Sequence, residues 1–307
     1  MQSKKSSKKK SPAERKNTKI VVDCSTLAYA AYYSYGHLSY NNEPTGVIFG
    51  FLSKMLLIAE TFQTNSFIFC WDSETELLRE QDYKGYKEKR RNKELTEEEK
   101  ISFISIHKQR DELRNSVLPR MGFRNSFIAD GFEADDLLAV YSIKLAKRFP
   151  VVMVTTDYDM FQCLNCCSIY NPSKKTTYTL RQFKEEFRID PNQWAMAKAI
   201  GGCDSDNVKG IQGISDPKKP TSKSLKYLRG ELTKGKVLAK IEGSEGQTII
   251  KRNLPIVTTP YKPEKLSRAI FRRDNLTIER FISIFEIYGC YSFLKRDKLN
   301  KWRELFL

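Results

Sequence analysis

The sequence predicts an α/β fold built around a mainly parallel sheet, and three observations lead to this prediction. Short runs of β-branched and aromatic residues recur along the first half of the chain. They are apolar throughout rather than alternating, as expected for strands covered on both faces. Helical patterns separate these runs, and acidic residues follow each of them. Because ligands bind beyond the carboxyl ends of parallel strands, those acids are the first candidates for a functional site.

Four apolar runs are expected to be strands: residues 19–23, 67–72, 127–129 and 151–156. The small and aromatic residues after Asp23 predict a helix, and a second helix is expected over residues 47–59. A strand that feeds a helix in this way is half of a parallel β-α-β unit.

Three carboxylates in four residues, Glu133, Asp135 and Asp136, stand directly ahead of an apolar run that begins at Leu137. Acidic residues are favoured in the first turn of a helix by its dipole, so a helix is expected to start there. Three acidic residues are more than the capping of one helix requires. Glu133 and Asp136 share one helix face and Asp135 is turned away from them. A charged helix start on a solvated surface is the alternative to a functional cluster.

Acids from four strand ends are expected to meet in one place, and they are Asp23, Asp72, Glu133, Asp135, Asp136, Asp157 and Asp159. Clustered carboxylates repel one another unless cations neutralise them, so a metal site is favoured over capping alone. No His or Cys is among these candidates, and an all-oxygen ligand set selects Mg²⁺ or Mn²⁺ over Zn²⁺.

The net charge of +16 over 307 residues indicates a polyanionic partner, of which nucleic acid is the commonest. Residues 1–18 are rich in Lys and Ser and are expected to be a disordered basic arm or a solubilising tail. Seven cysteines, an odd number, indicate reduced thiols in an intracellular protein. No apolar run suits a signal peptide or a membrane span, so a cytoplasmic protein without membrane partners is expected.

Residues 74–118 form a long polar excursion between the second and third expected strands. Its basic and aromatic part covers residues 82–91, and Thr96 followed by three glutamates predicts a capped helix. Interleaved Tyr and Lys or Arg suit a single strand of nucleic acid, since rings stack on bases and cations meet phosphates. A solvated charged helical hairpin is the alternative.

Residues 197–214 are helical and then punctuated by Gly210 and Gly213, a pattern that resembles a helix-hairpin-helix. Such a unit offers backbone N–H groups to phosphates and binds duplex without reading sequence. A basic helical region is expected from residue 222 to the end, with a loop over residues 272–275 and an amphipathic helix over residues 281–293.

Together these motifs resemble the flap endonuclease and 5′-3′ exonuclease family. They are Asp23, Asp72 and residues 83–85, 133–136, 157–159 and 205–214, in the order and spacing of that family. The resemblance extends from about residue 19 to about residue 260, and is strongest to stand-alone bacteriophage members, which are similar to the nuclease domain of bacterial DNA polymerase I. It implies a PIN-like nuclease core over residues 19–195 with a helical arch at about 74–118. Residues 196–307 would form a helix-hairpin-helix and C-terminal helical region.

The resemblance also implies roles for single residues. A first metal ion would be held or oriented by Asp23, Asp72, Glu133, Asp135 and Asp136, and a second by Asp157, Asp159 and Asp206. Catalysis would depend on Lys84, Asp135, Asp136 and Asp157, with Lys84 at the scissile phosphate and Tyr83 stacking on a terminal base. The further DNA contacts implied are Lys87, Arg90, Arg91, Lys198, Lys209, Gly210, Gln212, Gly213 and Lys218.

The chain departs from the family pattern at Cys203, where the family has the first acid of Gly-Asp-x-Ser-Asp. A neutral thiol is a poor ligand for Mg²⁺, so the second ion site is placed in doubt, with Asp204 as a displaced substitute. Ser215 replaces a glycine, and residues 216–220 resemble a small insertion at the hairpin, where K⁺ is a further expected ion.

The activity implied is hydrolysis of phosphodiester bonds by a monomer at 5′ flaps, 5′ overhangs or nicks of DNA, in replication or primer removal with replication proteins as candidate partners. Two alternatives remain open. One is a catalytically weakened structure-specific DNA-binding protein of the same fold. The other is an RNase H-like activity on RNA/DNA hybrids.

Overall fold

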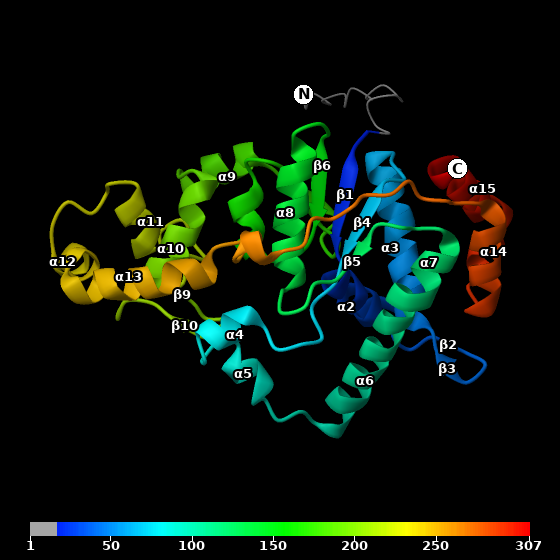
Figure 1. Cartoon of the computed structure of the whole chain (residues 1–307), viewed down its shortest axis with the longest axis horizontal. Helices are drawn as coiled ribbons and strands as arrows, with labels where there is room; N and C mark the ends of the chain where they lie inside the picture. Colours follow the sequence, from blue (N-terminus) through cyan, green and yellow to red (C-terminus); the bar gives the residue numbers. More distant parts are fainter. Residues whose placement is uncertain (1–16) are drawn as a thin grey trace, which may run out of the picture.

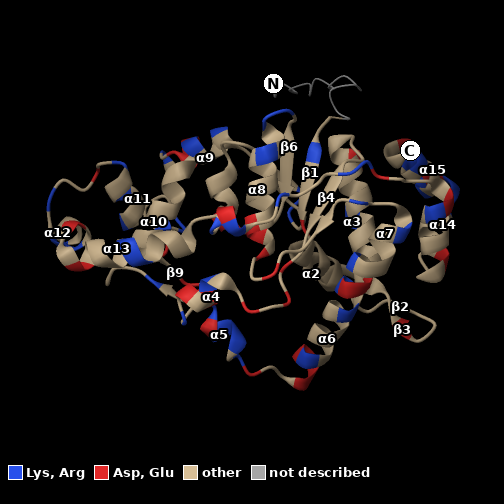
Figure 2. Cartoon of the chain, in the orientation of Figure 1, with Lys and Arg blue, Asp and Glu red and all other residues tan. Residues whose placement is uncertain are grey.

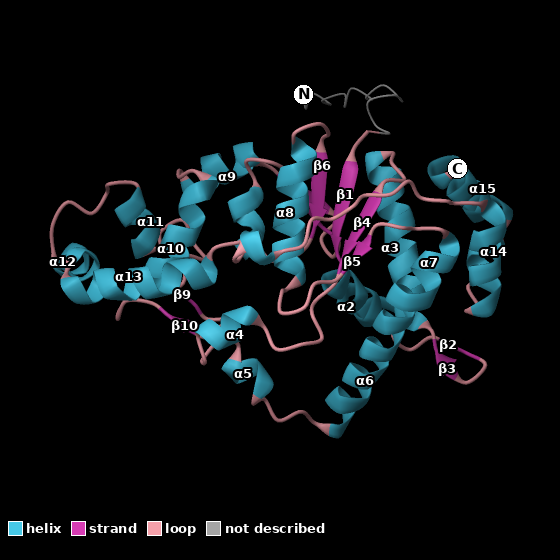
Figure 3. Ribbon diagram, viewed as in Figure 1, coloured by secondary structure: helices cyan, strands magenta, loops and turns pink. Residues whose placement is uncertain are grey.

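A computed structural model describes residues 17–307, and its centre is a six-stranded sheet in the order β5-β4-β1-β6-β7-β8 (Figures 1 and 3). All neighbouring strands are parallel except the β7–β8 hairpin. The strands are β1 (Lys19–Asp23), β4 (Phe67–Cys70), β5 (Ser126–Phe127), β6 (Val151–Val154), β7 (Ser168–Asn171) and β8 (Thr176–Tyr178). The α/β class and the mainly parallel sheet predicted from the sequence are confirmed.

Helices cover both faces of the sheet, which explains why its strands are apolar throughout. Along β1, Ile20 and Val22 enter one core cluster while Val21 enters the other, because successive side chains point to opposite faces. The first cluster packs under α2 (Cys24–Tyr35), α3 (Gly46–Phe62) and α7 (Leu118–Met121). The second packs under α8 (Ala134–Ala146), α9 (Leu180–Phe187) and α10 (Trp194–Gly201).

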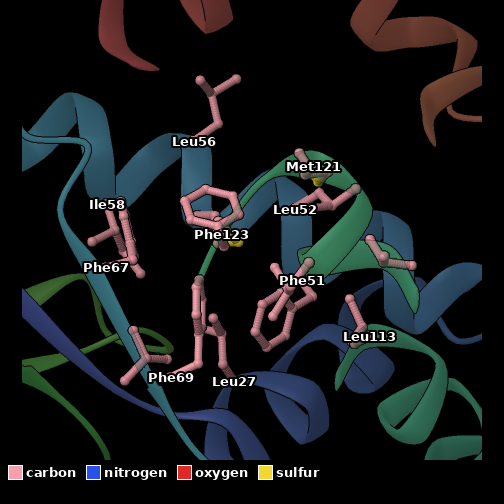
Figure 4. Close-up of a cluster of buried hydrophobic side chains, with 14 of the residues drawn as sticks. Leu27, Phe51, Leu52, Leu56, Ile58, Phe67, Phe69, Leu113, Met121 and Phe123 are labelled. Carbon is pink, nitrogen blue, oxygen red and sulfur yellow. The ribbon is translucent and has the colours of Figure 1, made fainter. Parts of the chain in front are cut away.

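Aromatic rings pack among aliphatic side chains in the first cluster, where Figure 4 shows Phe51, Phe67, Phe69 and Phe123. Phe67 and Phe69 of β4 stack on each other with ring centroids 6.0 Å apart, and Phe69 meets Phe123 edge to face at 5.3 Å. All three side chains are buried. Such packing fixes β1 and β4 against α3, and thereby fixes where the acids at the strand ends lie.

The excursion predicted at 74–118 is helical and projects from the sheet in Figure 1. It contains α4 (Leu78–Asp82), α5 (Glu88–Arg91) and α6 (Glu97–Glu112), followed by a π-helical turn, Leu113–Val117, and α7. Thr96 and Glu99 form the predicted capping box of α6.

The region after the sheet contains helices, a short hairpin of β9 (Gly202–Cys203) and β10 (Val208–Lys209), and loops, the longest of them over residues 258–277 with one 3₁₀ turn. Its helices are α11 (Lys223–Leu228), α12 (Lys236–Glu242), α13 (Ser244–Val257), α14 (Ile278–Ile287) and α15 (Arg296–Phe306). Gly210 lies against the Gly201–Gly202 backbone so closely that a Cβ would stand 2.3 Å from a carbonyl carbon. Gly213 has φ +83°, a conformation that favours glycine.

Several expected boundaries need correction. The strands expected at 67–72, 127–129 and 151–156 are shorter or shifted, because the acids that follow them begin loops or helices rather than extending the sheet. The helix expected at 281–293 is divided between α14 and a 3₁₀ turn, and the hairpin of β2 (Ser39–Tyr40) and β3 (Glu43–Pro44) has no predicted counterpart. Helices α14 and α15 share the first core cluster with α3, and the domain boundary at 195/196 stays a prediction. The basic arm lies outside the described residues, except for its last two.

Helix α14 allows a matched test of this packing, since Ile284 is buried and Ile287 on the same helix is 44% exposed. We expect Ile284→Ala to lower the free energy of unfolding by about 2–5 kcal/mol, because it leaves a cavity in the first core cluster. Ile287→Ala should change it by about 0.5 kcal/mol or less. Urea unfolding measures both, and equal losses would contradict the packing of α14 against the core.

Candidate metal centre and nucleic-acid interface

A cavity of about 930 Å³ opens at the carboxyl edge of the sheet, and carboxylates from four strand ends line it. Figure 2 shows acidic residues gathered below the sheet between α8 and α4, with Lys and Arg along α4 and α5. The lining acids that the sequence predicted are Asp23, Asp72, Glu133, Asp135, Asp157 and Asp159. The predicted convergence of acids from distant segments is therefore observed.

Asp23 ends β1 and begins α2, so one carboxylate serves both the helix and the cavity. It accepts hydrogen bonds from the backbone N–H of Thr26 (2.8 Å) and the hydroxyl of Thr155 (3.0 Å). Burial, and then the charge of Asp72, raise the pKa of Asp23 to about 6. Asp23 therefore both caps α2 and lines the cavity.

Asp135 and Asp157 face the same space from α8 and from the end of β6. Burial and the charges of Asp157 and Asp23 raise the pKa of Asp135 well above its ordinary value. Burial and Asp159 raise the pKa of Asp157 to about 6. None of Asp23, Asp135 and Asp157 has an ion-pair partner within residues 17–307. This part of the cavity is fit for a cation, because no ion pair of the described residues offsets the mutual repulsion of these carboxylates.

Asp136, predicted as a metal ligand and catalytic residue, lies outside the cavity, and that role stays a prediction. It is fully buried, and the Arg79 guanidinium donates hydrogen bonds to both of its carboxylate oxygens, at 2.7 and 2.9 Å. The backbone N–H of Tyr261 donates to it as well, at 2.8 Å. Asp136 is absent from the cavity wall, since a helix that turns Asp135 inward points the next residue elsewhere.

Glu133 lines the cavity with both oxygens engaged. Arg79 donates to it at 3.0 Å, the Tyr86 hydroxyl at 2.7 Å, and the Lys87 ammonium forms an ion pair with its other oxygen. Burial opposes its charge, but Lys87 and Arg79 outweigh burial and lower the pKa of Glu133. Its carboxylate holds α4 and the arch to α8, and a role as metal ligand stays a prediction.

Of the arch cations, the structure brings Lys87 and Arg90 to the cavity and leaves Lys84 exposed outside its wall. Lys87 lies 3.7 Å and Arg90 3.8 Å from an oxygen of Asp206. The catalytic role of Lys84 stays a prediction, whereas Lys87 is placed closer to the acids than the sequence indicated.

A second cluster lies beside the first and contains Asp159, Cys203 and Asp206, whose ligand atoms are all within 4.8 Å of one another. Asp204 does not join it. Its side chain is 74% exposed and pairs with Lys218 at 3.4 Å, because the turn after β9 points it to solvent. The structure therefore places Asp204 away from the cluster, and its role as a substitute for the missing acid stays a prediction.

Lys198, predicted to contact DNA, is buried instead. Its ammonium lies 2.6 Å from Asp159 and 3.2 Å from Asp216, with the Cys203 sulfur at 3.5 Å. Burial opposes its charge, but the neighbouring carboxylates outweigh burial and raise its pKa. A cation held in this way is not available to a phosphate on the surface.

Residues 18–188 match the family model described as "5′-3′ exonuclease, N-terminal resolvase-like domain". The chain belongs to the 5′-3′ exonuclease family. It is 26% identical over 207 residues to the 5′-3′ exonuclease of Buchnera aphidicola, covering 66% of this chain and 68% of that protein. It is 27% identical over 210 residues to that of Bacillus subtilis, covering 65% and 67%. It is 23% identical over 303 residues to DNA polymerase I of Caldicellulosiruptor bescii, covering 92% of this chain but 34% of the polymerase.

Solved structures of this family share the fold. The T5 5′-exonuclease with bound zinc ions aligns with a TM-score of 0.63 at 21% identity, over 94% of this chain and 98% of the T5 protein. Flap endonuclease-1 from Methanococcus jannaschii aligns with a TM-score of 0.55 at 17% identity, over 96% and 95%. The resemblance inferred from the sequence, and the PIN-like core with it, is confirmed.

The other residues predicted to bind DNA lie on the arch and around the hairpin of this exonuclease-family chain. Tyr83 packs under the Arg252 guanidinium, 5.7 Å from its ring centroid, and Arg91 pairs with Glu80. The hairpin and insertion residues with exposed side chains or backbone are Lys209, Gln212, Gly213 and Lys218, and Gly210 lies half-buried between them. Their DNA contacts stay predictions. Within residues 17–307, no helix combines the length and apolar character needed to span a membrane.

Sequence reasoning missed Arg79 and Asp216, both of which position charged residues of the site. A lone Arg in a charged helix and a lone Asp in an insertion carry no spacing signal. Only the fold brings Arg79 to Asp136, and Asp216 to Lys198. Tyr86 was visible within the aromatic and basic segment, but its bond to Glu133 was not.

The raised pKa of Asp23 predicts how the metal-free protein responds to pH. Because the folded value of about 6 exceeds the ordinary one, this group stabilises the fold at low pH, and that contribution is lost as pH rises through about 6. We expect Asp23→Asn to flatten the fall in Tm between about pH 4 and pH 6 in EDTA, as measured by differential scanning fluorimetry.

Added Mn²⁺ should raise the Tm of the unsubstituted protein more at about pH 7 than at about pH 5, because only the charged carboxylates bind it. If the Tm difference between the Asp23→Asn variant and the unsubstituted protein does not vary with pH, the electrostatic description of the cavity is contradicted.

Proposed function

We propose that this protein is a structure-specific, metal-dependent 5′ nuclease that hydrolyses phosphodiester bonds of DNA. One observation carries the proposal: Asp23, Asp72 and Asp157 from strand ends and Asp135 from α8 reach one cavity, without ion-pair partners in the described chain. Membership of the 5′-3′ exonuclease family supports the same activity. A solved T5 D15 flap endonuclease complex holds DNA and metal ions, which supports both as ligands here.

Asp23, Asp135 and Asp157 would hold Mg²⁺ or Mn²⁺, and Asp72 would orient their neighbourhood through its hydrogen bond from the Ala134 N–H at 3.0 Å. When bound, such an ion lowers the pKa of a water molecule and neutralises charge on the phosphate. The chain supplies the positions of these oxygens, because β1, β6 and α8 fix them through the two cores on either side of the sheet.

The arch and the hairpin would bind the nucleic acid on two sides of this cavity. Lys87 and Arg90 reach the cavity wall from the arch and can meet a phosphate that enters it. Tyr83 and Lys84 stand at the start of the same segment, beside the hairpin residue Asn207, whose backbone carbonyl lies 3.5 Å from the Tyr83 hydroxyl. A 5′ end or a flap junction fits a site where single-strand and duplex contacts adjoin.

At the hairpin, where K⁺ is expected, two lysine side chains of the chain occupy carbonyl oxygens that could bind this ion. The carbonyl oxygens of Gln212 and Gly213 are candidate K⁺ ligands in this turn, and they accept hydrogen bonds from Lys240 (3.2 Å) and Lys223 (2.8 Å). We therefore expect duplex affinity to be equal in K⁺ and Na⁺ at the same ionic strength, as measured by fluorescence anisotropy.

Replacing both lysines, as in Lys223→Met with Lys240→Met, should make affinity depend on K⁺, since the carbonyls would then lose their internal cations. A preference for K⁺ in the unsubstituted protein would show that the lysines do not fill this role.

A labelled 5′-flap DNA tests the nuclease function together with the separate roles of two adjacent acids. We expect Mg²⁺-dependent short products that EDTA abolishes. Asp135→Asn should retain the fold and DNA binding and lose cleavage. Asp136→Asn should instead lower the free energy of unfolding by about 3–5 kcal/mol, because it breaks the buried pair with Arg79.

Cleavage by Asp135→Asn at near-normal turnover would remove Asp135 from the site. DNA binding without metal-dependent cleavage would indicate the catalytically weakened binding protein. Faster cleavage of the RNA strand in an RNA/DNA hybrid than of the DNA flap would indicate the RNase H-like activity.

A further inference from the structure

Three cysteines share one turn at the border of the second core cluster, and none of them lines the acidic cavity. Cys163 ends the 3₁₀ turn that begins at Tyr158, and Cys166 and Cys167 directly precede β7. Cys163 and Cys167 are buried, whereas Cys166 is partly exposed. The Cys-x-x-Cys spacing therefore places one accessible thiol three residues after an enclosed one.

The backbone of this turn holds Cys163 and Cys166 at a separation that a disulfide can bridge. The N–H of Cys166 donates a hydrogen bond to the carbonyl of Cys163 at 2.9 Å, and the Cys167 N–H donates to the same oxygen at 3.1 Å. A turn closed in this way brings the α-carbons of its first and fourth residues within about 7 Å of each other. Disulfides span about 4.4–6.8 Å between α-carbons, so rotation of the two side chains can join Cys163 to Cys166.

The sulfur atoms of this turn are placed for thiol chemistry rather than for holding a metal ion together. That of Cys166 lies 3.1 Å, and that of Cys167 3.3 Å, from the Cys163 carbonyl oxygen. Within residues 17–307, the one group of three His, Cys, Asp or Glu side chains with all ligand atoms within 4.8 Å of one another lies elsewhere, at Cys203. A disulfide between the adjacent Cys166 and Cys167 would close a small ring that the planar trans peptide bond opposes.

Exposure and hydrogen bonding give these thiols different roles. Hydrogen bonding with the Cys163 and Cys167 thiols lowers the pKa of Cys166 to about 4. The same contact with Cys166, together with burial, raises the pKa of Cys163 well above its ordinary value. Because the thiolate is the nucleophile, the accessible Cys166 is the sulfur that meets an oxidant, and the enclosed Cys163 is the one that resolves the product.

We propose that Cys163 and Cys166 form a thiol–disulfide redox site that a hydroperoxide such as H₂O₂ oxidises. The Cys166 thiolate attacks one peroxide oxygen, the O–O bond breaks, and Cys166 becomes a sulfenic acid while hydroxide leaves and is protonated to water. The Cys163 sulfur then attacks the Cys166 sulfur, its proton leaves with the hydroxyl group as a second water molecule, and the S–S bond forms. The thiols lose two electrons and the peroxide gains them. A dithiol such as dithiothreitol reverses the oxidation.

Oxidation of the full chain by a small excess of H₂O₂ in EDTA tests the site. We expect the seven thiols, counted with dithionitrobenzoate after unfolding, to fall by two. Trypsin releases all three cysteines of the turn in one peptide, residues 149–174. Its mass should fall by two hydrogen atoms, and fragmentation should locate the link between Cys163 and Cys166. Dithiothreitol should restore both thiols. The site goes beyond the proposed nuclease function, since neither DNA nor a metal ion is present.

Substitutions separate the attacking thiol from the resolving one. Cys166→Ser should abolish the loss of thiols, because the accessible nucleophile is gone. Cys163→Ser should leave Cys166 as a sulfenic acid, which dimedone traps. Cys167→Ser should still form the disulfide. Cys290→Ala is the matched control, since Cys290 is buried in the first core cluster, and it should lose two thiols like the unsubstituted protein.

No loss of thiols in the unsubstituted protein, a link to Cys167, or a disulfide between two chains would overturn the proposal. Unchanged oxidation of Cys166→Ser, with folding verified by circular dichroism, would overturn it as well. Oxidation as expected in a chain that does not cleave 5′-flap DNA under reducing conditions would reject the proposed nuclease function and leave the redox site intact.

Discussion

Repulsion between carboxylates at one edge of the sheet is the constraint on which the site depends. Parallel strands deliver Asp23, Asp72 and Asp157 to that edge, and α8 adds Asp135. Bringing such charges out of water and close together costs free energy unless cations offset it. Residues 17–307 offset that cost around the edge of the cluster and place no ion-pair partner at its centre.

The internal cations define which acids remain for a metal ion. Arg79 forms an ion pair with Asp136, and Lys87 forms one with Glu133. Lys198 pairs with both Asp159 and Asp216. Each pair also connects elements that are distant in sequence: the arch to α8, and the insertion after the hairpin to the loop after β6. The same interactions that tune the charge of the cavity therefore hold the arch and the hairpin region in place around it.

The two core clusters give this arrangement its rigidity. Because β1 contributes alternate side chains to both, neither its position nor that of Asp23 can shift without disturbing the packing on each face. The arch lacks such support over much of α6, where Ile101 and Ile104 are exposed. The acids thus occupy the most constrained part of the fold, and the segment proposed to meet the nucleic acid occupies a less constrained one.

The sequence by itself determined the parallel α/β class, the family, and the central acids Asp23, Asp72, Asp135 and Asp157. Strand periodicity and the rule that parallel strands share one carboxyl edge are local or topological, and both are readable from residue order. It also identified Cys203 as a departure from the family pattern.

Only the tertiary structure decided which charges are already neutralised. Asp136 and Lys198 were assigned to metal and DNA because their types and spacing allow it, yet their partners Arg79 and Asp216 are far from them in the chain or within an insertion. The role of Asp204 as a substitute ligand was likewise inferred from its spacing, but its side chain points to solvent. An ion pair depends on distance and burial in three dimensions, and no one-dimensional pattern encodes these.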